Sequence, residues 1–185
     1  MDYDQQKPPP FLPIFDLPHM KKIRFQSAAW ALAALCSLPA WAVQPGQAAP
    51  GFELPGVAAP VQLGAYKGST VYLDFWASWC GPCKQSFPWM GEMQAKYKAQ
   101  GLRILAVNLD QKPADAQAFL KETPAGFDLA FDASGKTPKA YAIQGMPTSV
   151  LIGPDGHVIS VHSGFKPEQR AELEAQIRRA LNLKD

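Results

Sequence analysis

The segment YLDFWASWCGPCK, residues 72–84, is the stretch from which the rest of the chain is best interpreted. An apolar, β-prone run ends at Trp76, and a helical pattern begins at Lys84. Cys80 and Cys83 therefore stand where a strand passes into the N-terminus of a helix. The first amides of a helix have no partner within it and carry partial positive charge, which stabilises a thiolate. The pattern predicts a redox-active cysteine pair.

Composition limits what the chain can be. Its 185 residues are 47% hydrophobic and 18% charged, which suits one globular domain with an N-terminal tail. A formal net charge of +2 gives no case for binding nucleic acid or an anionic membrane surface. The third cysteine, Cys36, lies in an apolar N-terminal run. Without that run, the only sulfur chemistry belongs to the motif cysteines.

The N-terminus has the three regions of a secretory signal peptide. Basic residues follow Met20, an apolar run covers Ala28–Leu38, and Ala-Trp-Ala ends at Ala42. We predict translation from Met20, because residues 1–19 are proline-rich and precede the basic region, and cleavage after Ala42. A bilayer span needs about 20 residues, so an uncleaved anchor is the lesser alternative. The prediction gives an extension and signal peptide over residues 1–42 and a periplasmic domain over residues 43–185.

Hydrophobic periodicity gives an ordered series of strands and helices in the predicted mature chain. A small N-terminal hairpin is expected from Phe52–Leu54 and Pro60–Leu63. Strands are expected at Val71–Ala77, Leu102–Leu109, Phe127–Phe131, Thr148–Ile152 and His157–His162. Helices are expected at Lys84–Ala99, Pro113–Glu122, Lys136–Tyr141 and Pro167–Leu181. This alternation predicts an α/β sheet that is covered on both faces and ends in an antiparallel hairpin.

Several motifs together resemble the TlpA/ResA-like thiol-disulfide oxidoreductases, a redoxin branch of the thioredoxin fold. They are the run at residues 74–84, Pro88, the Gly-Met-Pro-Thr of residues 145–148, and residues 49–54 and 66–68 of the N-terminal extension. The resemblance spans residues 49–185. It implies a thioredoxin-like three-layer sandwich with a central mixed sheet, an N-terminal hairpin extension and an inserted helix and strand within residues 110–147.

The chain also departs from the family at three positions. Many TlpA-like proteins carry Glu where Ser86 stands, and thioredoxins carry Lys where the alignment places Ala106. Asp74, in contrast, resembles thioredoxin, whereas many TlpA-like sequences have a neutral residue there. These departures leave the redox tuning and the direction of electron flow open.

The two cysteines are expected to have different roles. Cys80 comes first, at the helix end, and is expected to be the more exposed sulfur and the nucleophile. Cys83, one turn inward, is expected to be the resolving thiol. The alternatives are a static disulfide or half of a metal site, but His157 and His162 are the only histidines of the mature chain. A zinc site would need more ligands, so we expect no metal and no cofactor.

Asp74 is expected to point inward from a central strand, on the opposite face to Phe75. A buried carboxylate has a raised pKa, so Asp74 could accept the proton of Cys83 when the mixed disulfide is resolved. The alternative is a surface or hydrogen-bonded strand aspartate without a catalytic role.

The substrate is expected to contact an apolar surface beside Cys80. Trp79 is expected to form that surface, with Trp76 in the core. The Met146–Pro147 bond is predicted to be cis, which costs little before proline, and would leave the Met146 backbone free to pair with an extended substrate. The expected substrate-binding residues are Trp79, Gly81, Pro82, Met146 and Pro147.

The preferred function is a periplasmic reductase of protein disulfides. The resemblance implies protein substrates with disulfides and a membrane electron donor of the DsbD or CcdA type, and we expect a monomer that binds no nucleic acid. Apocytochrome c, a copper-site assembly protein and misoxidised proteins are open as substrates. A dithiol oxidase and a copper-binding module remain as alternatives. A peroxidase is disfavoured because Pro-x-x-x-Thr-x-x-Cys is absent.

Overall fold

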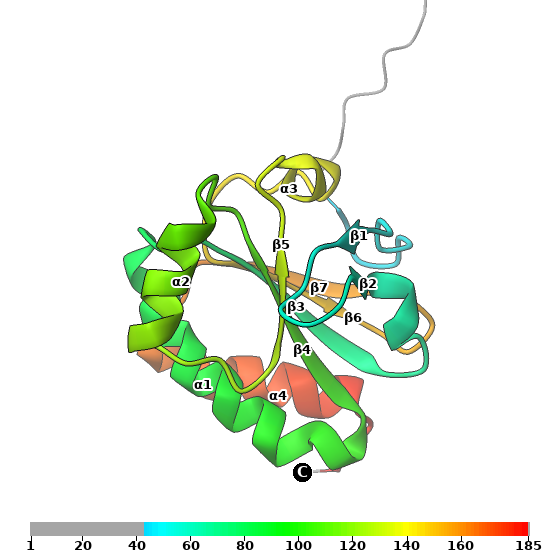
Figure 1. Cartoon of the computed structure of the whole chain (residues 1–185). Helices are drawn as coiled ribbons and strands as arrows, with labels where there is room; N and C mark the ends of the chain where they lie inside the picture. The colour runs from blue at the N-terminus through cyan, green and yellow to red at the C-terminus, as the bar shows by residue number, and fades with distance from the viewer. Residues whose placement is uncertain (1–42, 185) are drawn as a thin grey trace, which may run out of the picture. The chain divides into compact units, whose positions relative to one another are not determined.

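The computed structural model describes residues 43–184, which are built around a five-stranded mixed sheet (Figure 1). Across the sheet the strands are β5 (Asp128–Phe131), β4 (Leu102–Asn108), β3 (Thr70–Trp76), β6 (Thr148–Ile152) and β7 (Val158–Ser163). β3, β4 and β5 are parallel to one another, β6 is antiparallel to β3, and β7 is antiparallel to β6. The central mixed sheet expected from the sequence is confirmed.

The central strand β3 is buried at all seven of its positions. Its sequence, TVYLDFW, is rich in β-branched and aromatic residues, which pack well on a pleated surface. Burial on both faces explains why the run is almost continuously apolar and does not alternate with polar residues. Asp74 is the one carboxyl group in this mostly apolar strand.

One face of the sheet carries α1 (Gly81–Tyr97), α2 (Pro113–Glu122) and α4 (Arg170–Ala180). We call it the α1 face. Trp76 of β3 packs there with ring centroids 4.8 Å from Phe87 and 4.7 Å from Phe119. Aromatic rings on the strand and on two helices therefore form one cluster that fixes α1 over β3.

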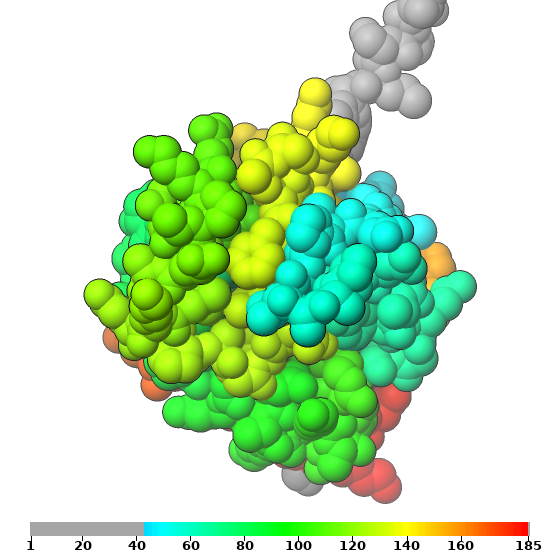
Figure 2. Space-filling view, in the orientation of Figure 1, coloured from blue at the N-terminus to red at the C-terminus, as the bar shows by residue number. Residues whose placement is uncertain are grey.

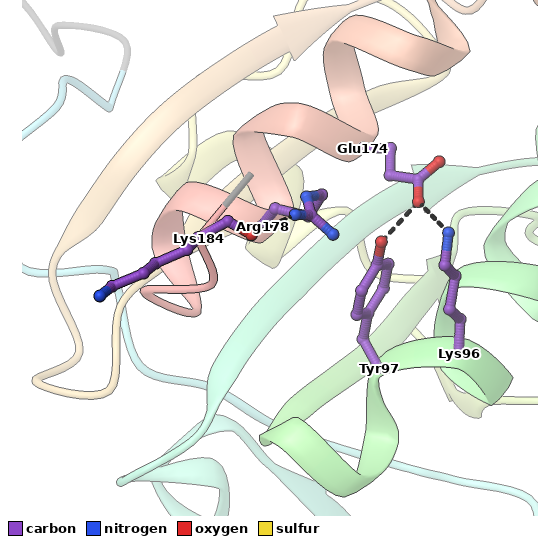
Figure 3. A network of polar contacts seen from close by, with 5 residues as sticks. All are labelled: Lys96, Tyr97, Glu174, Arg178 and Lys184. Atoms are coloured by element: carbon purple, nitrogen blue, oxygen red, sulfur yellow. Dashed lines mark hydrogen bonds and ion pairs between the residues drawn. The ribbon is translucent and has the colours of Figure 1, made fainter.

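A polar network joins α1 to α4 at the end remote from the cysteines (Figure 3). Glu174 of α4 accepts hydrogen bonds from the Tyr97 hydroxyl and from the Lys96 ammonium, the latter at 2.6 Å. Arg178 also donates to the Lys184 carbonyl beyond the helix. Glu174 therefore bridges the two helices that lie side by side on this face.

The opposite face is covered by α3 (Lys136–Ala140) and by the N-terminal segment. Phe75 points to this side, where its ring lies 5.4 Å from that of Tyr141. The Tyr141 hydroxyl donates to the Pro50 carbonyl at 2.8 Å, and Val43 is 7% exposed. The sheet is thus covered on both faces, as predicted.

The N-terminal hairpin, β1 (Glu53–Leu54) with β2 (Val61–Gln62), is also confirmed. Next to it, the Pro55 carbonyl accepts a hydrogen bond from the Phe131 amide of β5 at 2.9 Å. A Cβ at Gly56 would lie 2.3 Å from the Ala59 carbonyl oxygen, so only glycine fits this close approach.

Some element boundaries differ from the expectation. α1 begins at Gly81, not Lys84, because Cys80 caps it and Pro82 suits a first helical turn. It ends at Tyr97 and passes into a 3-10 turn, Lys98–Gln100. The last expected helix is likewise divided, with a 3-10 turn at Pro167–Gln169 before α4.

Other expectations concern parts outside the described residues. The signal peptide, the start at Met20 and the cleavage after Ala42 fall there and stay predictions. Within residues 43–184, no helix has the length and apolar character that crossing a membrane requires.

Candidate active site

Cys80 and Cys83 form a disulfide at the N-terminus of α1. The S–S distance is 1.99 Å and the two Cα atoms are 5.3 Å apart. Cys80 is the N-cap, and its Sγ accepts a hydrogen bond from the Cys83 amide at 3.2 Å. The positive end of the helix is therefore directed at the Cys80 sulfur, as the sequence predicted.

The two cysteines differ in their access to solvent. Cys80 is 5% exposed and Cys83 is fully buried, which is the expected order. Trp79 is 74% exposed directly before Cys80, and Gly81 and Pro82 are also exposed. A reagent or substrate thus meets the narrow exposed edge of Cys80 beside exposed Trp79, Gly81 and Pro82.

Asp74 is buried on β3, with 2% exposure, and the expectation that it points inward is confirmed. It shares the α1 face with Tyr72 and Trp76, because alternate residues of a strand point to the same side. Its Oδ2 has no hydrogen-bond partner among residues 43–184. Burial raises the pKa of Asp74 well above the usual aspartate range. A protonatable carboxyl therefore lies on the face that α1 covers with Cys83.

Met146 and Pro147 are joined by a cis peptide bond, as predicted. They precede β6, whose first residue Thr148 is paired with Phe75 near the end of β3. Met146 is half-buried and packs against the apolar cluster that contains both cysteines. The structure therefore brings the cis-proline loop and the cysteine motif to the same edge of the sheet.

A carboxylate that the sequence analysis did not single out holds the loop before the motif. Asp110 accepts hydrogen bonds from the Ser78 amide at 2.9 Å and the Ser78 hydroxyl at 3.0 Å. The side-chain amide of Asn108 donates to the same carboxylate at 2.8 Å. Asp110 is 6% exposed and Asn108 is 1% exposed. We call these three residues the Ser78 clamp.

The sequence did contain a signal for the Ser78 clamp. Polar Asn108 and Asp110 directly follow the apolar part of a buried strand parallel to β3. The carboxyl ends of neighbouring parallel strands lie at one edge of a sheet, where sites of α/β proteins are commonly built. The two residues could therefore have been placed beside the motif.

The structure shows the surroundings of Ser86 and Ala106, two positions at which the sequence departs from the family it resembles. The Ser86 hydroxyl, buried on α1, donates to the Cys83 carbonyl at 3.1 Å and so is engaged with its own helix. Ala106 stands opposite Asp74 in the β3–β4 register. The neighbouring strand β4 therefore presents a methyl group to the buried carboxyl at this register position.

A cavity of about 630 Å³ borders the Ser78 clamp. It lies between the N-terminal hairpin and α2, seen in Figure 2 in cyan and yellow-green on either side of the residues after β5. Its walls are mainly apolar, and Asn108 and Asp110 contribute polar atoms. No group of three or more His, Cys, Asp or Glu side chains is placed to hold a metal within residues 43–184.

The fold and the cysteine site together define a thioredoxin-fold thiol-disulfide oxidoreductase. A Redoxin family profile matches residues 44–177. Similar relatives are the thiol-disulfide oxidoreductases ResA of Bacillus thuringiensis subsp. konkukian and Bacillus subtilis, both 34% identical. The first alignment covers 69% of this chain and 74% of the relative, and the second covers 68% and 71%. The chain belongs to the Redoxin family.

Solved structures agree with this assignment. A Chlorobium tepidum protein, assigned by name as thiol:disulfide interchange protein DsbE, is 55% identical with a TM-score of 0.75. The match covers 76% of this chain and 99% of that one. A thiol-disulfide oxidoreductase from Bacteroides fragilis is 25% identical with a TM-score of 0.62, over 71% and 99% of the two chains.

Proposed function

We propose that the protein is a periplasmic reductase of protein disulfides. The Cys80 thiolate attacks one sulfur of a substrate disulfide, which releases one substrate thiol and forms a mixed disulfide. Cys83 then attacks the Cys80 sulfur. The Cys80–Cys83 bond forms, the mixed disulfide breaks, and the second substrate thiol leaves. Two electrons pass from the enzyme dithiol to the substrate.

Asp74 has the role of general base for the second attack. Cys83 is buried, and burial disfavours its thiolate unless a nearby group accepts the proton. Asp74 lies on the face covered by the helix that carries Cys83, and its raised pKa makes the carboxylate a stronger base than an exposed one. The proton of Cys83 passes to Asp74 as the internal disulfide closes.

Trp79, Gly81, Pro82 and Met146 form the substrate surface, and buried Pro147 shapes the loop that presents Met146. Trp79 is 74% exposed beside Cys80, which suits contact with varied protein partners. The predicted signal peptide supports export to the periplasm. A membrane electron donor of the DsbD or CcdA type re-reduces the pair there, and the protein acts as a monomer without cofactor.

The observation that carries the reductase direction is the hydrogen bonding of Cys80. Its Sγ receives one hydrogen bond in the described residues, from the Cys83 amide. Pro82, within the same turn, has no N–H to donate. Strong dithiol oxidants owe their high potentials to a stabilised reduced form, and this site offers modest stabilisation of the thiolate. The disulfide is therefore expected to be a weak oxidant.

The reduction potential of the Cys80–Cys83 couple tests the direction. It is measured against glutathione or dithiothreitol in the chain carrying Cys36→Ser, so that the pair is the sole couple. A value near or below the roughly −270 mV of thioredoxin supports a reductase. A value near the roughly −120 mV of the oxidant DsbA contradicts it and indicates a dithiol oxidase.

Trapping tests the roles of the cysteines and of Trp79. Cys83→Ser is expected to accumulate mixed disulfides on Cys80 with protein substrates, whereas Cys80→Ser is not. Trp79→Ala is expected to slow reduction of a protein disulfide but not of a small disulfide, since only the protein uses the surface. Equal slowing of both would remove Trp79 from the substrate surface.

A further inference from the structure

A row of polar side chains crosses three strands beneath α1. Asp74 of β3 is paired with Ser149 of β6, and Ser149 is paired with His162 of β7. Directly opposite residues of antiparallel strands point to the same face, with Cβ atoms about 4.5–5.5 Å apart. The three side chains therefore stand next to one another on the α1 face. We call them the polar row.

Both ends of the polar row carry a buried atom without a partner. Asp74 Oδ2 and His162 Nε2 have no hydrogen-bond partner among residues 43–184. Such atoms are uncommon, because leaving a buried polar group unpaired costs about 1–3 kcal/mol. Two of them on either side of one serine call for a common explanation.

Ser149 lies between these two residues in the strand register and carries a hydroxyl proton that can be donated. Its Oγ accepts a hydrogen bond from the Tyr72 hydroxyl at 2.8 Å. A serine hydroxyl is a donor as well as an acceptor and rotates to suit its neighbours. With Tyr72 as donor, the Ser149 proton is not used in that bond. Ser149 forms no hydrogen bond with Asp74 or His162 in this structure, so proton transfer requires these side chains to turn toward one another.

His162 connects the polar row with solvent. The residue is half-buried on the edge strand β7, although its Nε2 atom is buried. Asp74 is 2% exposed, and its register partner on the other neighbouring strand, β4, is Ala106. The polar path away from Asp74 therefore leads across β6 to β7 and not across β4.

We propose that Ser149 and His162 carry protons between the Asp74 carboxyl and solvent while the active-site disulfide opens and closes. The idea rests on the proposed role of Asp74 as the base for Cys83. When the disulfide closes, the Cys83 proton passes to Asp74, and a proton leaves through the Ser149 hydroxyl and the imidazole to water. The departing substrate thiolate takes a proton from solvent, so the balance is kept. Opening reverses the path.

Other ionisable groups lie on the elements that cover this part of the sheet. Tyr72 contacts Ser149 directly, and its own pKa is raised by burial and by the charge of Asp74. α4 contributes Arg170, whose guanidinium lies 5.8 Å from the Phe165 ring centroid. It also contributes Glu174, which Lys96 and Tyr97 engage (Figure 3). α1 contributes Cys83 itself.

Rapid mixing with imidazole rescue tests the proposal. The reduced full chain carrying Cys36→Ser is mixed with excess oxidised glutathione, and closure of the disulfide is followed by the change in tryptophan fluorescence. His162→Ala and Ser149→Ala are compared with His157→Ala, a matched control in the β6–β7 turn, where His157 pairs with Asp155. Circular dichroism verifies that each variant is folded, and His162→Gln replaces His162→Ala if that variant is not.

The route predicts a specific pattern of rates. His162→Ala is expected to close roughly tenfold more slowly than His157→Ala, less than the loss of a whole general base. Added imidazole restores most of that rate, because half-buried His162 lies on the edge strand β7 and is partly accessible to solvent. Ser149→Ala is also slow, but imidazole does not restore it, because the gap is buried. A structural role for His162 would give no rescue.

Two results overturn the route. One is equal closure rates for His162→Ala and His157→Ala, and the other is a slow His162→Ala that imidazole leaves unchanged. The reduction potential separates this proposal from the proposed function. A potential near that of an oxidant refutes the reductase direction but leaves the rate pattern intact, since closing the disulfide requires loss of a proton in either direction.

Discussion

Asp74 shows at the scale of one residue how burial shapes chemistry. Its carboxyl is nearly inaccessible, and burial raises its pKa. The folded protein therefore binds a proton that the unfolded chain releases near pH 4. Unfolding is then favoured as the pH rises above about 4, by up to about 1.4 kcal/mol for each pH unit until the folded pKa is passed. The residue therefore lowers stability at neutral pH.

Asp74→Asn should remove this pH dependence. The variant-minus-wild-type difference in unfolding free energy, from urea titrations between pH 4 and 8, is expected to grow with pH in favour of Asn. Asp155→Asn is the control, because the backbone amide of His157 lowers the pKa of exposed Asp155 and its difference has the opposite sign. A difference in unfolding free energy that does not change with pH for Asp74→Asn would mean that the carboxyl is not buried in solution.

At this scale the sequence predicted the residues of the motif but missed their partners. Cys80, Cys83 and Asp74 belong to one short segment, where spacing alone fixes the geometry. Asp110 and His162 were not assigned roles because their positions depend on the pairing of strands far apart in the chain. His162 becomes relevant only once β7 is aligned with β6 and β6 with β3.

At the scale of elements, patterns of apolar residues predicted the bounds of an element best where a clear local signal marks its start. The bounds of α2 and β6, Pro113–Glu122 and Thr148–Ile152, were predicted correctly. A proline at a first helical position and a cis-proline loop mark their starts. The start of α1 was missed because its cap is a cysteine sulfur, an unusual capping group that propensity does not recognise.

The inserted helix α2 is expected to contribute to the packing beneath the active site. Phe119→Ala should lower the unfolding free energy by about 3–5 kcal/mol, because its buried ring contacts both Trp76 and Phe87. Leu120→Ala on the same helix is the control. Leu120 is half-buried beside the cavity and is expected to cost about half as much. Equal losses in urea titrations would contradict this account of the cluster.

Acid should weaken the contact between α1 and α4 that Glu174 makes with Lys96 and Tyr97. Hydrogen bonds from Lys96 and then Tyr97 lower the pKa of Glu174. Its stabilisation is therefore present above the ordinary glutamate pKa and is lost as the pH falls through about 4 and below. Glu174→Gln is expected to be less stable than wild type at pH 7, with a difference that shrinks toward pH 3. Glu172→Gln on the exposed side of the segment should change little at either pH.

At the scale of the whole molecule, the N-terminal segment is part of the folded domain. Val43 is buried, and the Gly46 amide and Gln47 carbonyl form hydrogen bonds with Val158 at 2.8 Å. A chain that begins at Pro50 should therefore have an unfolding free energy about 2–4 kcal/mol lower than that of a chain that begins at Val43. Val43→Ala should fall between the two. Identical urea midpoints would mean that this segment does not hold the sheet.

The same segment has a consequence for the order of folding. It reaches both edges of the sheet, at β7 through Gly46 and Gln47 and at β5 through Pro55. Unpaired sheet edges are templates for association between chains. The segment is synthesised before the strands that it covers, so it docks only after β5 and β7 exist. A newly made chain thus passes through a stage in which both edges of the sheet are unpaired. At that stage it is most prone to aggregate with other copies of itself.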